Sequence, residues 1–457
     1  MGVTRPRLSP ERGGAVPFLP FILLLAACGG PSGSMRKQVN GLIAARDFNG
    51  ALALTEKAKE ASYGRKNQVL YYLDLGAVQH DAGKFKESDE SLDKAERRME
   101  ELYTKSVTQA AGTLLLNDNT TEYAGERFER AMVNVYRALN YVFLGDQENA
   151  LVEVRKLSRL LQEYADVYNG KRTAYKDDAF AQYLASLLYE DDGRRDDARI
   201  ALEKSRKAYS AYASAYGTSE PSLEPAGKIN GSNGGWNGNG ELVFLHYNGV
   251  APRKVSKSFS VAWRDAAIAL DASKDDEAES ARAKNAIRGG LLGKSITVSY
   301  PDYVQDPFLV SRSAVEAAGV SAETELAQDV SAIAQKDLAE RQAVIRTRAI
   351  ARATVKFVLA KAVSDEVSKK YGKNSWQHLL AQAGGAATSA ATEGADTRAW
   401  ATLPAQFRVA RLRLPPGSHD VVVKYLGATG ASLSTQTFKN VVIRKGRRTY
   451  LHDRTAL

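Results

Sequence analysis

Residues 70–95, LYYLDLGAVQHDAGKFKESDESLDKA, decide the fold of the first half of the chain. Apolar residues recur at helical spacing on both sides of Gly83, which predicts two amphipathic helices joined by a tight turn at that glycine. The first helix holds Leu75 and Gly76, and a glycine inside a helix lets a neighbouring helix come close. Phe85 follows the turn directly. We therefore expect a helical hairpin whose two helices touch near Gly76.

Three weaker copies of this unit flank it, at 42–58, 141–157 and 189–202. In each copy we expect a turn, followed by a helix with a small residue on its packing face. The expected turn residues are Arg46, Gly145 and Gly193, and the small residues after the last two turns are Ala150 and Ala198.

The hairpin pattern resembles the tetratricopeptide repeat, which implies a superhelix of helix pairs over residues 36–212. In this resemblance Leu75, Gly76 and Phe85 stand at packing positions of the repeat. Successive turn positions lie 37, 62 and 48 residues apart, whereas a regular array would repeat about every 34 residues. The copies are therefore degenerate, with extra helices or loops between them. A generic bundle of helical hairpins is the alternative.

The first 27 residues predict a signal peptide, because three arginines precede an apolar stretch at 17–27 that is too short to span a bilayer. The sequence Leu25-Ala26-Ala27-Cys28 resembles the lipobox of bacterial lipoproteins, which implies cleavage before Cys28 and acylation of that residue. Residues 28–35 would then form an acylated tether. In lipoproteins of this kind, an aspartate directly after the cysteine retains the protein in the inner membrane. Gly29 stands at that position here. For a Gram-negative source, the resemblance therefore implies the outer membrane, with the protein facing the periplasm. The alternative is an ordinary signal peptide that happens to contain a cysteine.

Composition argues against several kinds of site. Cys28 is the single cysteine, and the five histidines are scattered without short-range ligand spacing, so we expect no disulfide within the chain, no metal and no cofactor. The formal net charge is +10, of which the first 27 residues contribute +2. The sequence GGLLGKS at 289–295 ends like a phosphate-binding loop, but Arg288 stands at the first glycine position and a strand is expected next. We expect no binding of nucleotides or nucleic acid.

The segment 117–141 carries the candidate binding residues. Its helix, with Thr120 or Thr121 as the expected cap, places Glu126, Arg130, Arg137 and Tyr141 on one face. The runs at 123–133 and 396–404 resemble a family of bacterial outer-membrane lipoproteins with tetratricopeptide-like repeats and no assigned activity. Four residues of this segment could line a groove that binds a partner. The alternative is that the aromatic residues among them fill a seam between helices. The four are Tyr123, Glu126, Phe128 and Tyr136.

The second half is predicted to be a separate mixed α/β domain at 241–457, joined by a Gly/Ser/Asn/Pro-rich linker at 213–240. Strands are expected at 241–247 and 296–300, and a long helix at 322–370. From about residue 403 the chain resembles a small β-sandwich module. We also expect Asp396 to pair with Arg398, with Trp400 packed beneath. The basic residues of one face of the long helix are Arg341, Arg348, Arg352 and Lys356.

The fold class expected is therefore mainly α with a smaller α+β part. The function expected is a non-enzymatic protein-interaction scaffold, anchored to the membrane through acyl chains, whose partners are envelope proteins or cell-wall components. An accessory factor for peptidoglycan synthesis is a narrower alternative, by analogy of fold alone. A cell-envelope hydrolase is the enzymatic alternative, although the sequence has no GxSxG or HExxH motif to support it.

Overall fold

Pairs of helices build the first half of the protein, in a computed structural model that describes residues 33–108, 121–167, 175–222, 225–226, 236, 238–262, 295–371 and 394–456. A short π-helical turn, Lys59–Tyr63, and a 3₁₀ turn, Arg65–Asn67, connect the first pair to the second. The chain is mainly α with an α+β part, as expected. The paired helices are α1 (Gly33–Ala44) and α2 (Phe48–Ala58), α3 (Gln68–Asp81) and α4 (Phe85–Thr108), α5 (Arg127–Leu144) and α6 (Gln147–Val167), and α7 (Ala179–Asp191) and α8 (Arg195–Tyr216).

The predicted hairpin turns are confirmed. Gly83, Gly145 and Gly193 have φ angles of 74°, 76° and 75°, in the left-handed region that glycine enters without a steric penalty. Arg46 holds the equivalent position with φ of 61°. Its guanidinium donates two hydrogen bonds, of 2.6 and 2.7 Å, to the carboxylate of Asp453. The ion pair therefore anchors an arginine at a turn position that favours glycine.

The predicted packing positions lie at helix contacts, and all but the partly buried Phe85 are buried. A Cβ atom added to Gly76 would lie 2.7 Å from Leu92 Cγ, so α3 and α4 do touch at this glycine. Phe85 stacks on Phe143 with ring centroids 4.8 Å apart. The remaining packing positions, Leu75, Ala150 and Ala198, are buried as well.

Local polar contacts set where helices begin. The side chain of Asp178 accepts a 2.7 Å hydrogen bond from the Ala181 amide and caps α7. The side chain of Glu129 accepts one of 3.0 Å from the Glu126 amide at the start of α5. The cap expected at Thr120 or Thr121 is therefore wrong: α5 begins at Arg127, where Glu129 bonds back to the preceding backbone.

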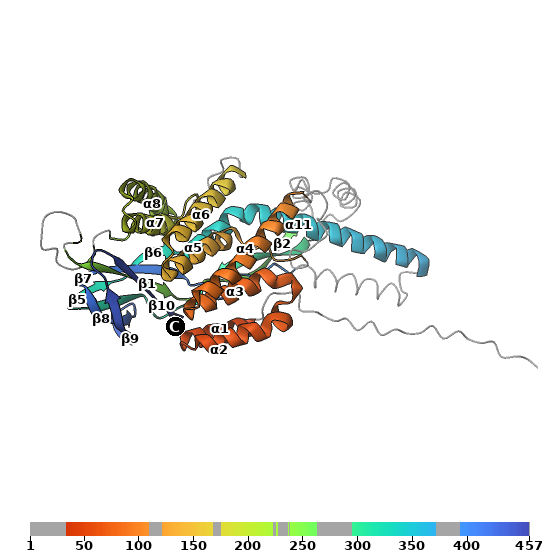
Figure 1. The fold of residues 1–457 in the computed structure, drawn as a ribbon. Coiled ribbons are helices and arrows are strands. Elements are labelled where there is room, and N and C mark those ends of the chain that lie inside the picture. Colours follow the sequence, from red (N-terminus) through yellow and green to blue (C-terminus); the bar gives the residue numbers. More distant parts are fainter. Residues whose placement is uncertain are drawn as a thin grey trace, which may run out of the picture.

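A four-stranded sheet covers α3, α5 and α7 (Figure 1). Aromatic rings connect the layers: Phe180 stacks on Phe407 with centroids 5.6 Å apart, and His80 Nε2 lies 3.0 Å from the Tyr247 hydroxyl. The middle turns of these three helices are almost wholly buried, because outer helices pack on one side of them and the sheet on the other. In sheet order the strands are β10 (Arg448–Thr455), β1 (Gly240–Asn248), β7 (Gln406–Leu414) and β6 (Glu325–Asp329), with β1 and β10 parallel.

A second four-stranded sheet covers the other face of the first. Side chains alternate along β1: Val243 and Leu245 join the helical core, while Leu242 and Phe244 join a core shared by the two sheets. All nine residues of β1 are buried, because both of its faces are covered. The second sheet has the order β5 (Val320–Glu323), β4 (Arg312–Ala317), β8 (Gly417–Leu426) and β9 (Ser432–Ile443).

A two-stranded ribbon, β2 (Arg253–Ala262) and β3 (Ser295–Val304), runs beside the long helix α11 (Val330–Tyr371). The predicted helix at 322–370 is wrong over its first eight residues, since 322–329 belong mostly to strands. The helix starts later because Asp329 Oδ1 accepts a 2.8 Å hydrogen bond from the Ala332 amide.

The predicted basic face of α11 is not simply solvated. Arg341 binds Glu126 and Asp337 at 2.6 and 2.7 Å. Arg348 and Arg352 also have interaction partners, and the side chain of Lys356 lies outside the described residues. The first part of this face therefore joins α11 to α5.

The hydrophobic core runs across the predicted domain boundary at 213–240. One cluster contains Tyr136 and Phe180 from the helices together with Tyr247 and Phe407 from the sheet. Helix α8 reaches Tyr216 and β1 begins at Gly240, so both ends of the predicted linker are regular structure. The strands expected in a module from residue 403 onward exist, but they are divided between the two sheets and pair with earlier strands.

Candidate functional site

Of the four residues predicted to form a partner groove, the three aromatic ones are buried and Glu126 is partly buried, with its side chain 14% exposed. Tyr123, Phe128 and Tyr136 have exposed fractions of 3%, 3% and 0%. Phe128 contacts Tyr303 of the ribbon with ring centroids 6.1 Å apart, and Tyr136 packs on Trp400. These aromatic residues fill seams within the chain, because residues from its second half pack on them.

Two glutamates at the start of α5 have opposite electrostatic environments. Burial would raise the pKa of Glu126, but Lys254 and Arg341 outweigh burial and hold the pKa well below its ordinary value. Burial raises the pKa of Glu129 to about 7. Oppositely shifted carboxyls are typical of acid–base pairs. However, neither glutamate lines the cavity between α4 and α6 or the cavity beside β7. Their partners are Lys254, Arg341 and the Trp400 amide, so the two glutamates hold the start of α5 to later segments of the chain.

The segment 396–402 is held against the helices by buried carboxylates. Glu129 Oε1 accepts a 2.7 Å hydrogen bond from the Trp400 amide. Asp74 Oδ1 accepts bonds from the Ala401 amide at 3.0 Å and from the Thr402 amide at 3.0 Å. The predicted pairing of Asp396 with Arg398 is confirmed at 2.7 Å, as is the burial of Trp400.

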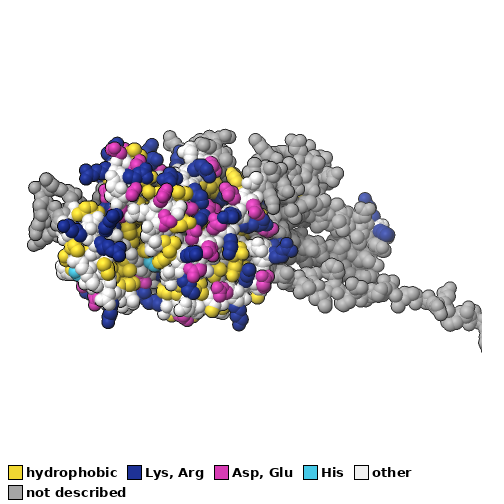
Figure 2. Space-filling model, viewed as in Figure 1, with side chains coloured by type: hydrophobic (Ala, Val, Ile, Leu, Met, Phe, Trp, Pro, Cys, Tyr) yellow, Lys and Arg dark blue, Asp and Glu magenta, His cyan; other side chains and the backbone are white. Residues whose placement is uncertain are grey.

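An open groove lies between α4 and α6, with α5 as its floor. The cavity has a volume of about 470 Å³, within the range of ordinary ligand sites. Acidic and basic side chains are interspersed over these helices, with apolar side chains between them (Figure 2). On α4, Arg97 pairs with Asp93 at 2.8 Å, and on α6, Arg159 pairs with Glu163 at 3.5 Å. We call this cavity the α4–α6 groove.

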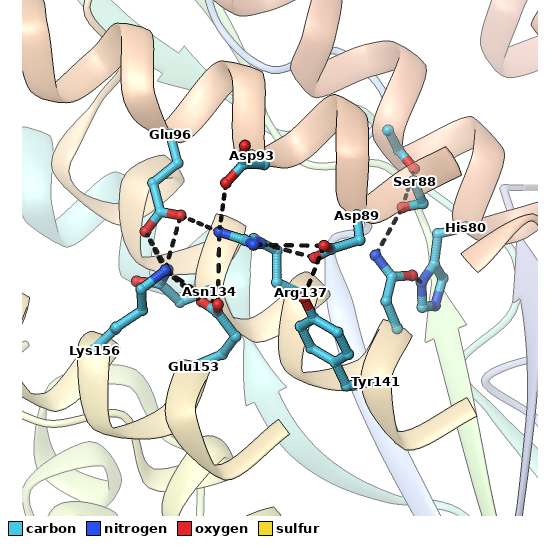
Figure 3. A network of polar contacts seen from close by, with 12 residues as sticks. His80, Ser88, Asp89, Asp93, Glu96, Asn134, Arg137, Tyr141, Glu153 and Lys156 are labelled. Atoms are coloured by element: carbon cyan, nitrogen blue, oxygen red, sulfur yellow. Dashed lines mark hydrogen bonds and ion pairs between the residues drawn. The ribbon is translucent and has the colours of Figure 1, made fainter. Parts of the chain in front are cut away.

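The floor of the groove is fixed by a buried network around Arg137 (Figure 3). Arg137 Nε donates a 2.8 Å hydrogen bond to Asp89, and its Nη1 donates to Glu96. The hydroxyl of Tyr141 also donates to Asp89, at 2.9 Å. The amide of Asn134 donates bonds of 2.9 and 3.2 Å to Glu96 and Glu153. Because these groups hold one another from three helices, the floor is preorganised.

Charges in this network are not evenly balanced. Two cations, Arg137 and Lys156, face four carboxylates, which belong to Asp89, Asp93, Glu96 and Glu153. Burial would raise the pKa of Glu96, but Arg137 and Lys156 outweigh it and lower that pKa. Burial prevails for Glu153, whose pKa is raised.

The far end of the groove has a different chemistry. The guanidinium of Arg130 lies over two tyrosine rings, 4.8 Å from the centroid of Tyr103 and 5.8 Å from that of Tyr164. Tyr164 is only 5% exposed, and its buried hydroxyl has no hydrogen-bond partner within the described part of the chain. All three side chains line the cavity.

Sequence reasoning found part of this groove. It placed Glu126, Arg130, Arg137 and Tyr141 on one helix face. The structure turns Arg130 and Arg137 toward α4 and α6. Glu126 departs from that expectation, because it precedes α5 and pairs with Lys254 and Arg341. It missed Tyr103 and Tyr164, which lie 27 residues before and 34 residues after Arg130. Their tyrosine rings carry no local signal that separates a groove from a helix seam.

A second cavity of about 370 Å³ lies beside β7, lined by Ser222, Ala226 and Arg411 among others. The basic side chain in this lining, Arg411, pairs with Glu241 at 2.5 Å, so its charge is already compensated within the chain. Within the described residues, no cluster of three or more histidine, cysteine or carboxylate side chains is arranged to hold a metal ion.

No protein-family model, curated protein or solved structure matched this chain.

Proposed function

We propose that the protein is a non-enzymatic scaffold of the bacterial cell envelope, which binds a segment of a partner in the α4–α6 groove. The observation that carries the proposal is the groove itself, an open cavity with a preorganised polar floor. The face of α3, α5 and α7 opposite this groove packs on the chain's own sheet. A partner is therefore expected on the outer side of the helices.

We propose further that the helix pairs are degenerate tetratricopeptide-like repeats and that the two packed sheets form a β-sandwich-like unit. The left-handed residues at the four hairpin turns and the Gly76–Leu92 contact support the first assignment. The core shared by the two sheets supports the second. On the runs at 123–133 and 396–404, we assign the chain to the outer-membrane lipoproteins with such repeats.

The proposed anchor is an acylated Cys28, in the outer membrane and facing the periplasm. Cys28 and the signal sequence before it lie outside the described residues. Helix α1 begins only five residues after Cys28, so the tether spans at most about 18 Å and the body would stay close to the lipid surface. No helix in the described part of the chain combines the length and the apolar character that a membrane span requires.

An accessory role in peptidoglycan synthesis is a narrower form of this proposal, in which the partner is a synthetic enzyme of the cell wall. A hydrolase is less well supported. The oppositely shifted pair Glu126 and Glu129 is the feature that would favour it, and Lys254 and Arg341 already neutralise Glu126.

Site-specific photocrosslinking in intact cells tests the scaffold proposal. A photoreactive side chain at Arg97, which is 76% exposed on the groove rim, should give one discrete adduct with a second protein. The matched control is Ile200 on α8, which is 43% exposed and lies outside the groove lining. The same adducts from both positions, or none from Arg97, would contradict a partner in the groove.

A further inference from the structure

We propose that the Arg130 end of the α4–α6 groove receives a carboxylate group of the partner, held by the guanidinium of Arg130 and the hydroxyl of Tyr164. This inference rests on the proposed function and adds the chemistry by which the groove recognises its partner. It follows from the geometry of three side chains from three helices.

Arg130 is placed to bind a ligand through its edge. Its guanidinium lies over the rings of Tyr103 and Tyr164, and contacts with rings leave the N–H groups of a guanidinium as hydrogen-bond donors. Within the part of the chain that the structure describes, no carboxylate lies within ion-pair distance of Arg130. The other basic side chains of the groove differ from Arg130 in this respect, because each has an acidic partner: Arg97 pairs with Asp93, Lys156 with Glu96 and Arg159 with Glu163.

Tyr164 supplies a second donor at the same place. Tyr164 lines the cavity, although only 5% of the residue is exposed. Its hydroxyl is buried and has no hydrogen-bond partner among the residues that the structure describes. A buried hydroxyl without a partner costs free energy, which an incoming acceptor would recover. Burial raises the pKa of Tyr164 to about 12, so the hydroxyl keeps its proton and donates.

Two donors, one of them cationic, select an anionic acceptor. A carboxylate fits the planar edge of a guanidinium with two parallel hydrogen bonds. Phosphate offers similar oxygens but more negative charge, and the groove lining already holds Asp93, Glu96, Glu100 and Glu163. Repulsion from these groups opposes a dianion more than a monoanion. We therefore favour a carboxylate, as found on an acidic side chain of a peptide.

Glu100 offers an internal control. It lines the same cavity, is exposed, and lies one helical turn from Tyr103 on α4. Its negative charge opposes a second carboxylate nearby, so removing that charge should strengthen binding of an acidic ligand.

The test is calorimetric titration of the whole mature chain, from residue 28 onward, with two peptides. These are acetyl-Ala-Ala-Glu-Ala-Ala-amide and the same peptide with Gln in place of Glu. The Glu peptide should bind at least about tenfold more tightly, as expected for charge-assisted hydrogen bonds. Arg130→Gln should remove that preference, Tyr164→Phe should reduce it, and Glu100→Gln should increase affinity for the Glu peptide. Tyr164→Phe keeps the ring that packs on Arg130 and removes only the hydroxyl, so it preserves the fold.

Equal affinities for the two peptides, or no heat from either at concentrations up to about 10 mM, would overturn the proposal. So would a Glu preference that survives Arg130→Gln. Inorganic phosphate that displaces the Glu peptide at lower concentration than acetate does would overturn the choice of a carboxylate. If adducts still form from Arg97 in cells while the peptides fail, the scaffold proposal stands and the carboxylate inference alone is lost.

Discussion

Gly76→Ala tests the close approach of α3 and α4. The added Cβ would lie 2.7 Å from Leu92 Cγ, 2.8 Å from Leu92 Cδ2 and 3.4 Å from the Ser88 carbonyl oxygen. Leu92 is fully buried, so its side chain has little room to move. The hydroxyl of Ser88 also donates a 2.7 Å hydrogen bond to the Gly76 carbonyl, which holds the two helices together at this point. The new methyl group must therefore displace a packed side chain.

The expected size of the effect follows from two opposing contributions. Replacing glycine with alanine inside a helix stabilises the fold by about 1 kcal/mol. Overpacking a closed contact costs about 1–3 kcal/mol, so Gly76→Ala should be neutral or destabilise by up to about 2 kcal/mol. Gly76→Leu should be the more severe change. Gly41 in α1 is the matched control, because it is an exposed helical glycine whose added Cβ would meet nothing within 4 Å.

The assay is urea unfolding of the whole mature chain, followed by circular dichroism and compared at equal m-values. Gly41→Ala should raise the free energy of unfolding by about 0.5–1 kcal/mol, and Gly76→Ala should fall below it by about 1–3 kcal/mol. If Gly76→Ala stabilises the protein as much as Gly41→Ala does, the helices do not touch here and the hairpin packing described above is refuted.

Three further predictions concern the anchor, pH and the domain boundary. Cys28→Ser should move the protein from the membrane fraction to the soluble or unprocessed pool, and mass spectrometry that finds an unlipidated mature N-terminus elsewhere in the natural chain would contradict this. Burial raises the pKa of Glu129 from 4.5 to about 7, so the folded state binds this proton more tightly and loses stability as pH rises through that interval. Glu129→Gln should flatten that decline in urea titrations between pH 4.5 and 7, and an unchanged pH dependence would exclude Glu129 as its source. A protease site inserted between Asn233 and Gly234 should yield two fragments that co-elute in gel filtration and unfold together, because the core crosses the predicted domain boundary. Fragments that separate without denaturant would instead support two independent domains.

Local geometry explains which parts of the fold the sequence predicts well. Gly83, Gly145 and Gly193 mark turns because a positive φ angle strongly favours glycine, whatever the rest of the chain does. Strands such as β1 and β8 are also predicted, since their apolar and β-branched residues indicate an extended conformation. These features depend on a few neighbouring residues.

Contacts between distant segments explain what the sequence does not predict. The aromatic residues near the start of α5 indicate burial, but nothing local indicates that Tyr303 and Trp400 cover them. Lys254 occupies a strand rich in polar residues, yet its side chain is 2% exposed because Glu126, 128 residues away, compensates its charge. The groove floor is similar, since Arg137 finds Asp89 across 48 residues.

The join between the first hairpin and β10 bears on when the protein can fold. Asp453, the partner of Arg46, is 407 residues further along the chain, and β10 forms the parallel neighbour of β1. Until residues 448–455 have been synthesised, α1 and α2 lack this ion pair and β1 has one open edge. Contacts of such sequence separation slow folding. A nascent chain would thus remain incompletely folded until these residues have left the ribosome, with a strand edge that could pair with another chain in the meantime.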